Sequence, residues 1–355
     1  YIKKNLEFSG NYKIKDLIYF LLIKAYQNKF SVDENSKNVE QNTREIIKKY
    51  KSTAVKKAAS ILFEIKRLLN ENINDEANVK KRNYLINSYN DLIPYSSRSN
   101  DINLFNDIRS IDNEISRLTT YYYIENVLKI FLGAIYNLDK IHPLDYVINC
   151  LGCQIKEILK PQNTDVLNSE ADYIYNYLYK TGASKNQIKS VYKIIQSRND
   201  KNFNLKNYKN RYIFCHGTRA ENIIGILSQG LKIAPVQAKF TGSSYGAGIY
   251  LSDFFSFSMG YCPSYSTSLF RYARNFNNDS KSPKLFMLLV EVAVGIIGAN
   301  NDTNNVSMRL NFNDSSITNE GYGIFKNSEN IDYGGIIVAR DETNVRVKYI
   351  VEFEG

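Results

Sequence analysis

Two kinds of hydrophobic pattern divide the chain into an earlier and a later part. In residues 1–137 the apolar side chains recur at steps of three and four, which is the spacing of one face of a helix. Two stripes show this spacing most clearly: Val55, Ala59, Leu62, Ile65 and Leu69, then Leu104, Ile108, Ile111, Ile115, Leu118 and Tyr122. Stripes of this kind usually form a core, and no alternating strand pattern accompanies them. The earlier part is therefore predicted to be a helical bundle.

The ends of the helices in this part are also marked in the sequence. Ser99 or Asp101 is expected to cap the start of the second stripe's helix, because both side chains accept hydrogen bonds from unpaired backbone N–H groups. Pro94 is expected to end the preceding helix, since proline has no N–H to continue the hydrogen-bond ladder.

Beyond Pro143 the pattern changes to short runs rich in β-branched residues. Residues 212–215 and 285–294 are apolar almost throughout, which predicts buried strands. Residues 345–353 alternate, which predicts a strand with one wetter face. The wetter positions are Arg346, Lys348, Ile350 and Glu352. The stretch 297–332 is rich in Asn, Ser and Gly and is predicted to be a loop or excursion.

The change of pattern and the length of 355 residues predict two domains, because one core per roughly 150 residues is usual. We place a helical domain at 1–137 and a mixed α/β domain with a β-sheet core at 138–355, so that the fold class is α+β. The sequence starts with Tyr1 and is expected to be an excerpt of a longer one. No signal-peptide pattern is visible, and the apolar run 17–23 is too short to span a bilayer.

The net charge of +10 raises the question of a nucleic-acid partner. Asn, Lys, Ile and Tyr are abundant along the whole chain, however, and no basic stripe alternates with aromatic residues as a base-stacking groove requires. The composition therefore argues against direct DNA binding by this segment.

The four cysteines are Cys150, Cys153, Cys215 and Cys262. The first two have the spacing of a metal or redox pair, but no second pair or nearby histidine completes a zinc site. Buried thiols in a reducing compartment are the simpler interpretation, which fits a cytosolic or nuclear protein without a metal.

The chemically most informative residues lie between 214 and 262. The sequence reads FCHGTR at 214–219, GILSQGLKIAP at 225–235 and TGSSYGAGIYLSD at 241–253, followed by Ser258 and Tyr261. A histidine thus ends an apolar strand, and glycines follow it that permit close approach of a flat ligand. A lone histidine at a strand end is more often structural, and each of the 28 tyrosines is individually expected to be a packing residue. Only the joint spacing carries a functional hypothesis.

This order of residues resembles the NAD-binding catalytic domain of the poly(ADP-ribose) polymerase family, which has the diphtheria-toxin-like ADP-ribosyltransferase fold. The helical part supports the resemblance through LIP at 92–94, the long stripe at 104–122 and HPLDY at 142–146. The resemblance covers nearly all of the chain. It points to the DNA-dependent branch, in which a helical regulatory domain precedes the catalytic domain and restrains its activity.

The resemblance implies NAD as the substrate, protein acceptors that include the protein itself, and a nuclear location. DNA would be engaged through domains outside this segment. Gly217 would offer its backbone N–H and C=O to the nicotinamide amide, and Ser258 a hydroxyl to the amide oxygen. Tyr261 and Tyr250 would close the two sides of the ring. His216 would hydrogen-bond the adenine-side ribose.

Further NAD contacts are implied for Thr218, Gly225, Lys232 and Tyr245. The family usually has Arg where Lys232 stands, so that a planar guanidinium with several N–H donors is replaced by a compact ammonium group. The resemblance implies no metal.

The clearest departure from the family is at a late-strand glutamate that polymer-forming members carry. With Asp341 and Lys348-Tyr349 as anchors, the ungapped alignment places Ile336 there, and a shift by one places Gly335. Neither residue can accept a hydrogen bond from a ribose hydroxyl. General-base work contributes about 10²–10⁴-fold, so its loss is expected to impair chain elongation.

The combination of His216, Tyr250 and Ile336 is the arrangement of members that transfer one ADP-ribose unit. An acidic side chain of the target can then act as the nucleophile, because it is already ionised. The predicted activity is mono-ADP-ribosylation of proteins at Asp or Glu.

Two alternatives stay open. In the first, the protein is a poly(ADP-ribose) polymerase in which Glu329, Asp332 or Glu342 supplies the missing acid. In the second, it is a pseudoenzyme that binds NAD without turnover.

Overall fold

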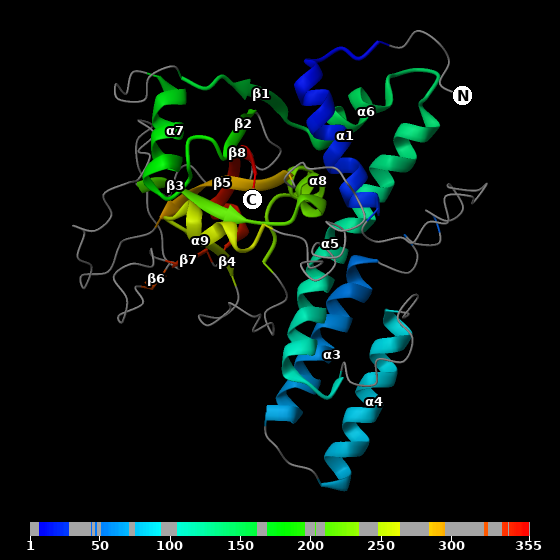
Figure 1. The fold of residues 1–355 in the computed structure, drawn as a ribbon. Coiled ribbons are helices and arrows are strands. Elements are labelled where there is room, and N and C mark those ends of the chain that lie inside the picture. Colours follow the sequence, from blue (N-terminus) through cyan, green and yellow to red (C-terminus); the bar gives the residue numbers. More distant parts are fainter. Residues whose placement is uncertain are drawn as a thin grey trace, which may run out of the picture. The chain divides into compact units, whose positions relative to one another are not determined.

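The computed structural model describes residues 7–27, 44, 47, 51–70, 75–93, 105–161, 169–195, 203, 210–233, 248–262, 284–294, 323–325, 336–339 and 341–354. Figure 1 labels its helices and strands. The chain divides into two compact units. The first comprises Tyr1–Glu7, Leu22–Val147 and Ile233–Gly248, and the second comprises Phe8–Leu21, Ile148–Lys232 and Ile249–Gly355. The domain boundary expected at residue 137 stays a prediction.

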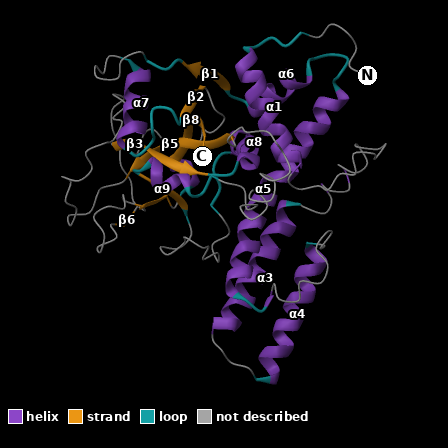
Figure 2. Ribbon diagram, viewed as in Figure 1, coloured by secondary structure: helices purple, strands orange, loops and turns teal. Residues whose placement is uncertain are grey.

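The first unit is built mainly from three helices within the described residues. They are α3 (Ser52–Asn70), α4 (Glu76–Leu92) and α5 (Ile108–Tyr136), coloured purple in Figure 2. Most positions of the two predicted stripes are buried in their shared core, including Val55, Ala59, Leu62, Ile65, Ile111, Ile115 and Leu118. Leu104 lies outside the described residues. The predicted helical bundle is confirmed for this part of the chain.

The helix ends agree with the sequence in one place and differ in another. Helix α4 ends at Leu92, two residues before Pro94, as predicted. Helix α5 is capped by Asp107, whose side chain accepts a hydrogen bond from the Ser110 N–H at 2.9 Å. The predicted cap at Ser99 or Asp101 is therefore wrong, because the helix starts later than its apolar stripe. Both of those residues lie outside the described part of the chain.

One buried polar contact interrupts the apolar core of the bundle. The hydroxyl of Tyr89 on α4 donates to the carboxylate of Glu114 on α5, and both side chains are buried. The ring of Tyr89 also meets the ring of Phe105 edge-on, with the centroids 5.6 Å apart. Because a buried carboxylate is costly without a hydrogen-bond partner, this contact favours one register between the two helices.

The second unit is organised around an eight-stranded sheet in which each described pairing is antiparallel. Across the sheet the strands follow the order β1 (Gln154–Ile158), β2 (Ile188–Ile195), β8 (Val345–Glu354), β5 (Lys284–Val294), β3 (Asn210–Gly217), β4 (Ile249–Ser252), β7 (Ile336–Ala339) and β6 (Gly323–Phe325). Strands β3, β5 and β8 are the three runs predicted from the sequence. The predicted α+β fold with a β-sheet core is confirmed. Of the predicted excursion at 297–332, only β6 lies within the described residues.

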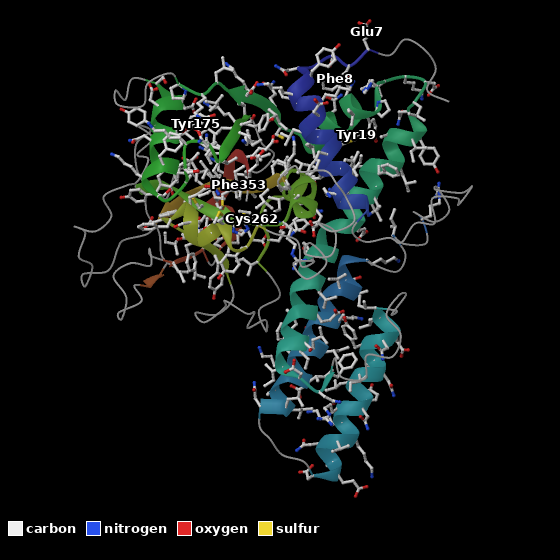
Figure 3. All side chains as sticks on the ribbon, viewed as in Figure 1. Glu7, Phe8, Tyr19, Tyr175, Cys262 and Phe353 are labelled. Carbon is white, nitrogen blue, oxygen red and sulfur yellow. The ribbon has the colours of Figure 1, made fainter. Side chains whose placement is uncertain are left out.

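Helices join the strands of this unit and cover the sheet. They are α7 (Glu170–Lys180), α8 (Ala220–Gln229), α9 (Phe255–Met259) and the 3-10 helix η5 (Glu342–Asn344). Side chains of α7 and α9 share a buried core with the sheet, where Tyr175 and Phe353 contribute large rings (Figure 3). The rings of Phe255 and Phe353 meet edge-on at 5.0 Å.

Two further helices, α1 (Tyr12–Gln27) and α6 (Pro143–Leu151), contribute residues to both units. The N-terminal part of α1 contacts the sheet. Lys13 Nζ lies 2.6 Å from Glu157 Oε1, and the rings of Phe20 and Phe286 lie 5.6 Å apart. A helix from the predicted bundle therefore packs with the sheet. No helix that the structure describes is both long and apolar enough for a bilayer crossing.

Strand β8 differs from its predicted character along half of its length. Arg346 and Lys348 are only partly buried, as expected of a wetter face, but Ile350 and Glu352 are buried. The prediction is wrong there because β8 lies between β2 and β5, and Glu352 is paired with Lys284 at 2.7 Å.

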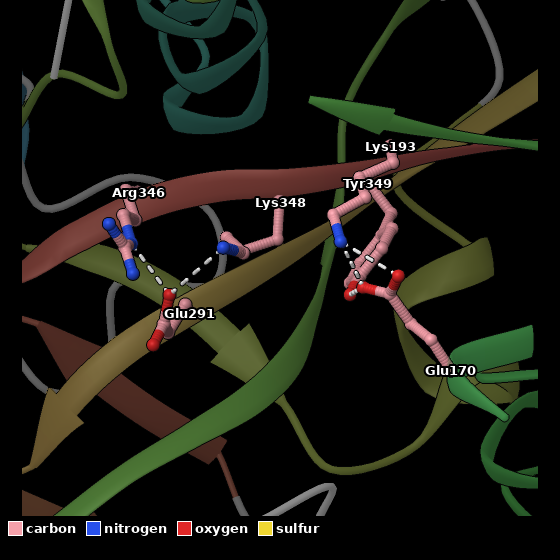
Figure 4. A network of polar contacts seen from close by, with 6 residues as sticks. All are labelled: Glu170, Lys193, Glu291, Arg346, Lys348 and Tyr349. Atoms are coloured by element: carbon pink, nitrogen blue, oxygen red, sulfur yellow. Dashed lines mark hydrogen bonds and ion pairs between the residues drawn. The ribbon is translucent and has the colours of Figure 1, made fainter. Parts of the chain in front are cut away.

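Cross-strand charge pairs stabilise the same region. Glu291 of β5, with 1% of its surface exposed, lies 2.6 Å from Arg346 Nε and 3.8 Å from Lys348 Nζ (Figure 4). Beside it, the carboxylate of Glu170 accepts hydrogen bonds from Lys193 at 2.7 Å and from the Tyr349 hydroxyl at 2.5 Å. Glu291 and Glu170 thus each have a cationic partner within this unit.

Candidate functional site

The residues singled out by the sequence gather where β3 ends. His216 and Gly217 are the last two residues of β3, which lies between β5 and β4. Strand β4 carries Tyr250 and is followed by α9, which carries Ser258. The antiparallel sheet thus brings two motifs about 40 residues apart in sequence to one edge of the second unit.

Gly217 has no room for a side chain. A Cβ at this position would lie 2.0 Å from the carbonyl oxygen of Ser258 and 2.8 Å from Cβ of Tyr261. Because contacts under 3.0 Å are essentially never seen for a real Cβ, any other residue would displace the backbone. The structure therefore places Gly217, Ser258 and Tyr261 against one another, and we name these three residues the Gly217 cluster.

The three members of the Gly217 cluster differ in exposure. Ser258 is buried, and its hydroxyl donates to the backbone carbonyl of Cys215 at 3.2 Å, which ties α9 to β3. Tyr261 has 51% of its surface exposed, and its ring lies 5.9 Å from the ring of Phe257. A buried hydroxyl and a half-exposed ring thus lie against a backbone segment that only glycine can form.

His216 is held in a defined protonation state. Its Nδ1 lies 2.8 Å from the backbone carbonyl oxygen of Tyr250, and a carbonyl only accepts, so Nδ1 carries the proton. Burial lowers the pKa of His216 from 6.5, and the hydrogen bond to Tyr250 opposes that shift. The imidazole is therefore neutral at physiological pH, and Nε2 is a hydrogen-bond acceptor.

The start of α8 holds an uncompensated polar atom. Thr218 is buried, and its hydroxyl oxygen accepts a hydrogen bond from Asn222 Nδ2 at 3.3 Å. The other amide atom of that side chain, Oδ1, is buried without a hydrogen-bond partner. Such a group costs about 1–3 kcal/mol, which suggests that a ligand satisfies it.

Sequence reasoning missed Asn222. The available signal was its position four residues after Thr218, a spacing that brings two side chains together around the start of a helix.

The remaining part of α8 leads to a charged pair. Gly225 is buried within the helix, which ends at Gln229 and is capped by Gly230, whose φ of 81° favours glycine. Two residues later Lys232 Nζ lies 2.7 Å from Glu342 Oε2 on η5. Both side chains are about one-third exposed, at 30% and 34%.

Ile336 is the first residue of β7 and stands in a defined register. It pairs with Ser252 of β4, which in turn pairs with Cys215 of β3, next to His216. Its side chain is half-buried and has no hydrogen-bonding group. Gly335, Tyr245, Glu329 and Asp332 lie outside the described residues.

The thiols near the site are not reactive. Burial raises the pKa of both Cys215 and Cys262 to about 12, so neither is a thiolate at neutral pH. All four cysteines are free; Cys153 is buried as predicted, whereas Cys150 is only half-buried. Among the described residues, no group of three or more His, Cys, Asp or Glu side chains is arranged to hold a metal ion.

Known proteins are similar in sequence to this chain. A family model described as "Poly(ADP-ribose) polymerase catalytic domain" matches residues 168–354, just over half of the chain. Poly [ADP-ribose] polymerase 1 of Danio rerio is 26% identical over 247 residues, which are 68% of this chain and 22% of that protein. Poly [ADP-ribose] polymerase 2 of Arabidopsis thaliana is 34% identical over 159 residues, which are 43% of this chain and 22% of that protein.

A human relative gives a similar result. Poly [ADP-ribose] polymerase 2 of Homo sapiens is 31% identical over 158 residues, 43% of this chain and 24% of that protein. The chain spans about a fifth of the length of these relatives.

Proposed function

The chain belongs to the poly(ADP-ribose) polymerase family, and from the geometry of its site we propose that it is an NAD-dependent protein ADP-ribosyltransferase. It cleaves the bond between nicotinamide and ribose and transfers the ADP-ribose unit to a protein acceptor. The single observation that carries this proposal is the Gly217 cluster, because a backbone edge closed to any Cβ lies there beside a buried hydroxyl and an exposed ring.

In this proposal the Gly217 cluster holds the nicotinamide. The backbone of Gly217 pairs with the amide, while the rings of Tyr261 and Tyr250 enclose the pyridine ring. The hydroxyl of Ser258 has one proton, which points to the Cys215 carbonyl. Donation to the ligand amide therefore requires that the hydroxyl rotate, whereas its lone pairs can accept from the amide NH₂ without rotation.

The neutral His216 and the uncompensated Asn222 hold the adenosine part. Nε2 of His216 accepts a hydrogen bond from a ribose hydroxyl, since Nδ1 is occupied by Tyr250. Oδ1 of Asn222 accepts a second one, which removes the cost of its burial. Thr218 lies beside Asn222, and Gly225 lies one helical turn after Asn222 on α8.

The chemical step needs little from the protein beyond positioning. Departure of nicotinamide breaks the C–N bond and develops positive charge on the ribose, as in glycoside hydrolysis. An oxygen of an acceptor carboxylate then bonds to the same carbon, and no proton has to be removed. Because Ile336 has no group to activate a weakly nucleophilic ribose hydroxyl, the product carries a single ADP-ribose unit at Asp or Glu.

Labelled NAD tests this proposal. Incubation of the protein with an acceptor is expected to give one labelled band without a ladder, with release of one nicotinamide per transferred unit. The variant Ile336→Glu is expected to extend the product. A long ladder from the unchanged protein would refute single-unit transfer.

The two alternatives have separate signatures. The polymerase alternative needs another acid to replace the missing glutamate. Glu342 is a poor candidate for this role, because its carboxylate forms an ion pair with Lys232. A binding-only protein would show NAD binding by calorimetry with no nicotinamide release.

The setting of this activity is also part of the proposal. It rests on the family's DNA-dependent branch and places the protein in the nucleus, with DNA contacted by domains outside this segment and with itself among its acceptors.

A further inference from the structure

The backbone ladder joins β3 to β4 at a single place, although both strands lead to proposed site residues. Strand β3 pairs with β5 at every residue from Asn210 to Gly217, but among the described residues it pairs with β4 only through Cys215 and Ser252. Gly217 ends β3, whereas Ser258 lies on α9, which follows β4. The spacing within the Gly217 cluster therefore depends largely on contacts outside the ladder.

Tyr177 on α7 reaches this joint from the buried core that it shares with Cys215. Its hydroxyl donates to the backbone carbonyl of Asp253, the residue after Ser252, at 3.1 Å. The same oxygen lies 3.6 Å from Cys215 Sγ. A tyrosine hydroxyl has one proton, which points to the carbonyl, so the thiol is the donor in the second contact. One side chain thus bonds to β3 and to the segment after β4.

The hydroxyl of Tyr177 is a permanent donor. The residue has 4% of its surface exposed, and burial raises the pKa of its hydroxyl well above the usual 10. The proton therefore stays in place over the whole physiological range, and the bond to Asp253 does not depend on pH.

The end of α7 holds the same segment at a second point. The backbone N–H of Ser256 donates to the carbonyl of Thr181 at 3.2 Å. At Gly182, whose φ is 109°, a Cβ would lie 2.8 Å from Cβ of Ser256. Helix α7 thus contacts the chain both before α9, at Asp253, and within it, at Ser256.

We propose that Tyr177 is a positioning residue for the proposed reaction. Its hydroxyl holds the chain that leads into α9 at a fixed distance from the end of β3, so that Ser258 and Tyr261 stay against Gly217. Tyr177 acts through these residues and does not itself contact the substrate. This inference rests on the proposed function, because it assumes that the nicotinamide occupies the Gly217 cluster.

The variant Tyr177→Phe removes the hydroxyl and keeps the buried ring. Calorimetry then measures the affinity for benzamide, which probes the Gly217 cluster, and for ADP-ribose, which lacks the nicotinamide. Benzamide is expected to bind about tenfold more weakly. The affinity for ADP-ribose is expected to stay nearly unchanged, because His216 and Asn222 precede the displaced segment and lie on β3 and α8.

The matched control is Tyr192→Phe. Tyr192 is buried to the same degree, at 3% exposure, and its hydroxyl donates to Glu352 at 3.3 Å. Its loss is expected to lower the melting temperature as Tyr177→Phe does but to leave the affinity for benzamide unchanged. A second variant, Gly182→Ala, pushes against Ser256 without altering the Tyr177 hydroxyl and is expected to weaken benzamide alone.

The outcomes separate positioning from a structural role. Unchanged benzamide affinity in Tyr177→Phe, or an equal loss in Tyr192→Phe, would overturn the role of Tyr177 and leave the proposed function standing. Equal weakening of benzamide and ADP-ribose would also overturn it. If Tyr177→Phe does not fold, the ratio of the two affinities in Gly182→Ala decides in the same way. A lack of benzamide binding by the unchanged protein would remove the proposed function and this inference together.

Discussion

The Gly217 cluster and the Lys232–Glu342 pair are two regions of one proposed site that are built in different ways. The cluster consists of backbone contacts so close that no side chain fits at position 217. The pair consists of two flexible, partly exposed side chains joined by one short contact. A region fixed by the fold cannot be adjusted without displacing the chain, whereas a surface ion pair can change by single substitutions. Geometry that a whole family shares is therefore expected in a region of the first kind. Features that differ between members are expected in a region of the second kind.

The largest effect is expected when the cluster is broken. In Gly217→Ala the new methyl group would lie 2.0 Å from the Ser258 carbonyl oxygen, so that strand and helix must separate. A displacement of about 1 Å at a reacting site can reduce the rate about 10²-fold, and nicotinamide release is expected to fall at least that far. The rate and the melting temperature should be measured together.

A neighbouring glycine provides the control for this substitution. A Cβ at Gly260 would meet the Phe257 carbonyl oxygen at 3.6 Å, which is an ordinary contact. Gly260→Ala is therefore expected to keep nearly full activity. Equal loss in both variants would show that the turn tolerates no change and that position 217 is not special.

A smaller effect, dependent on pH, is expected at His216. Burial lowers the pKa of this imidazole below 6.5, so its acceptor nitrogen is available throughout the neutral range. The affinity for NAD is expected to stay constant above pH 6.5 and to fall below it. The free energy of unfolding is expected to fall in the same pH range. Below pH 6.5 the unfolded chain protonates this histidine more readily than the folded protein does, so acid favours unfolding until the pH falls through the folded pKa.

The pH profile of NAD binding can be assigned with two variants. His216→Ala should bind NAD about tenfold more weakly, and its affinity should no longer fall below pH 6.5. His142→Ala removes the other histidine, and its affinity should still fall below pH 6.5. An acidic limb centred above 6.5 would contradict the neutral imidazole.

The smallest effect is expected from salt. Raising the ionic strength to about 1 M shortens the screening length to about 3 Å, which should weaken the interactions of the partly exposed Lys232 and raise the KM for NAD about twofold. Inhibition by a benzamide, which would occupy the Gly217 cluster, should change less. If benzamide inhibition were the more salt-sensitive of the two, the contrast between the regions would be wrong.

Regular parts of the fold could be predicted because local pattern and burial coincide there. The stripe from Val55 to Ile65 lies on α3 and is buried as its spacing requires. Residues 285–294 form β5 for the same reason. At Asp107 the pattern failed, since the apolar spacing continued upstream of the residue that starts the helix.

The rest depends on contacts between distant segments. Glu352 looks like a surface residue in the sequence, and only the presence of β2 and β5 on its two sides buries it. Lys232 and Glu342 are 110 positions apart, and no periodicity connects them. The roles at Gly217 and Ser258 came from a family resemblance, and their close approach depends on how α9 folds back on β3.

Helix α1 affects how any regulation by the helical part can be examined. Truncation of residues 1–137 would strip the Phe20 ring from Phe286 and the Lys13 ammonium from Glu157, and would bare sheet surface that the helix shields. A catalytic fragment made in this way would itself be destabilised. Any change in its rate would then combine release from inhibition with structural damage to the sheet. A shortened protein that retains Phe8–Leu21 separates the two.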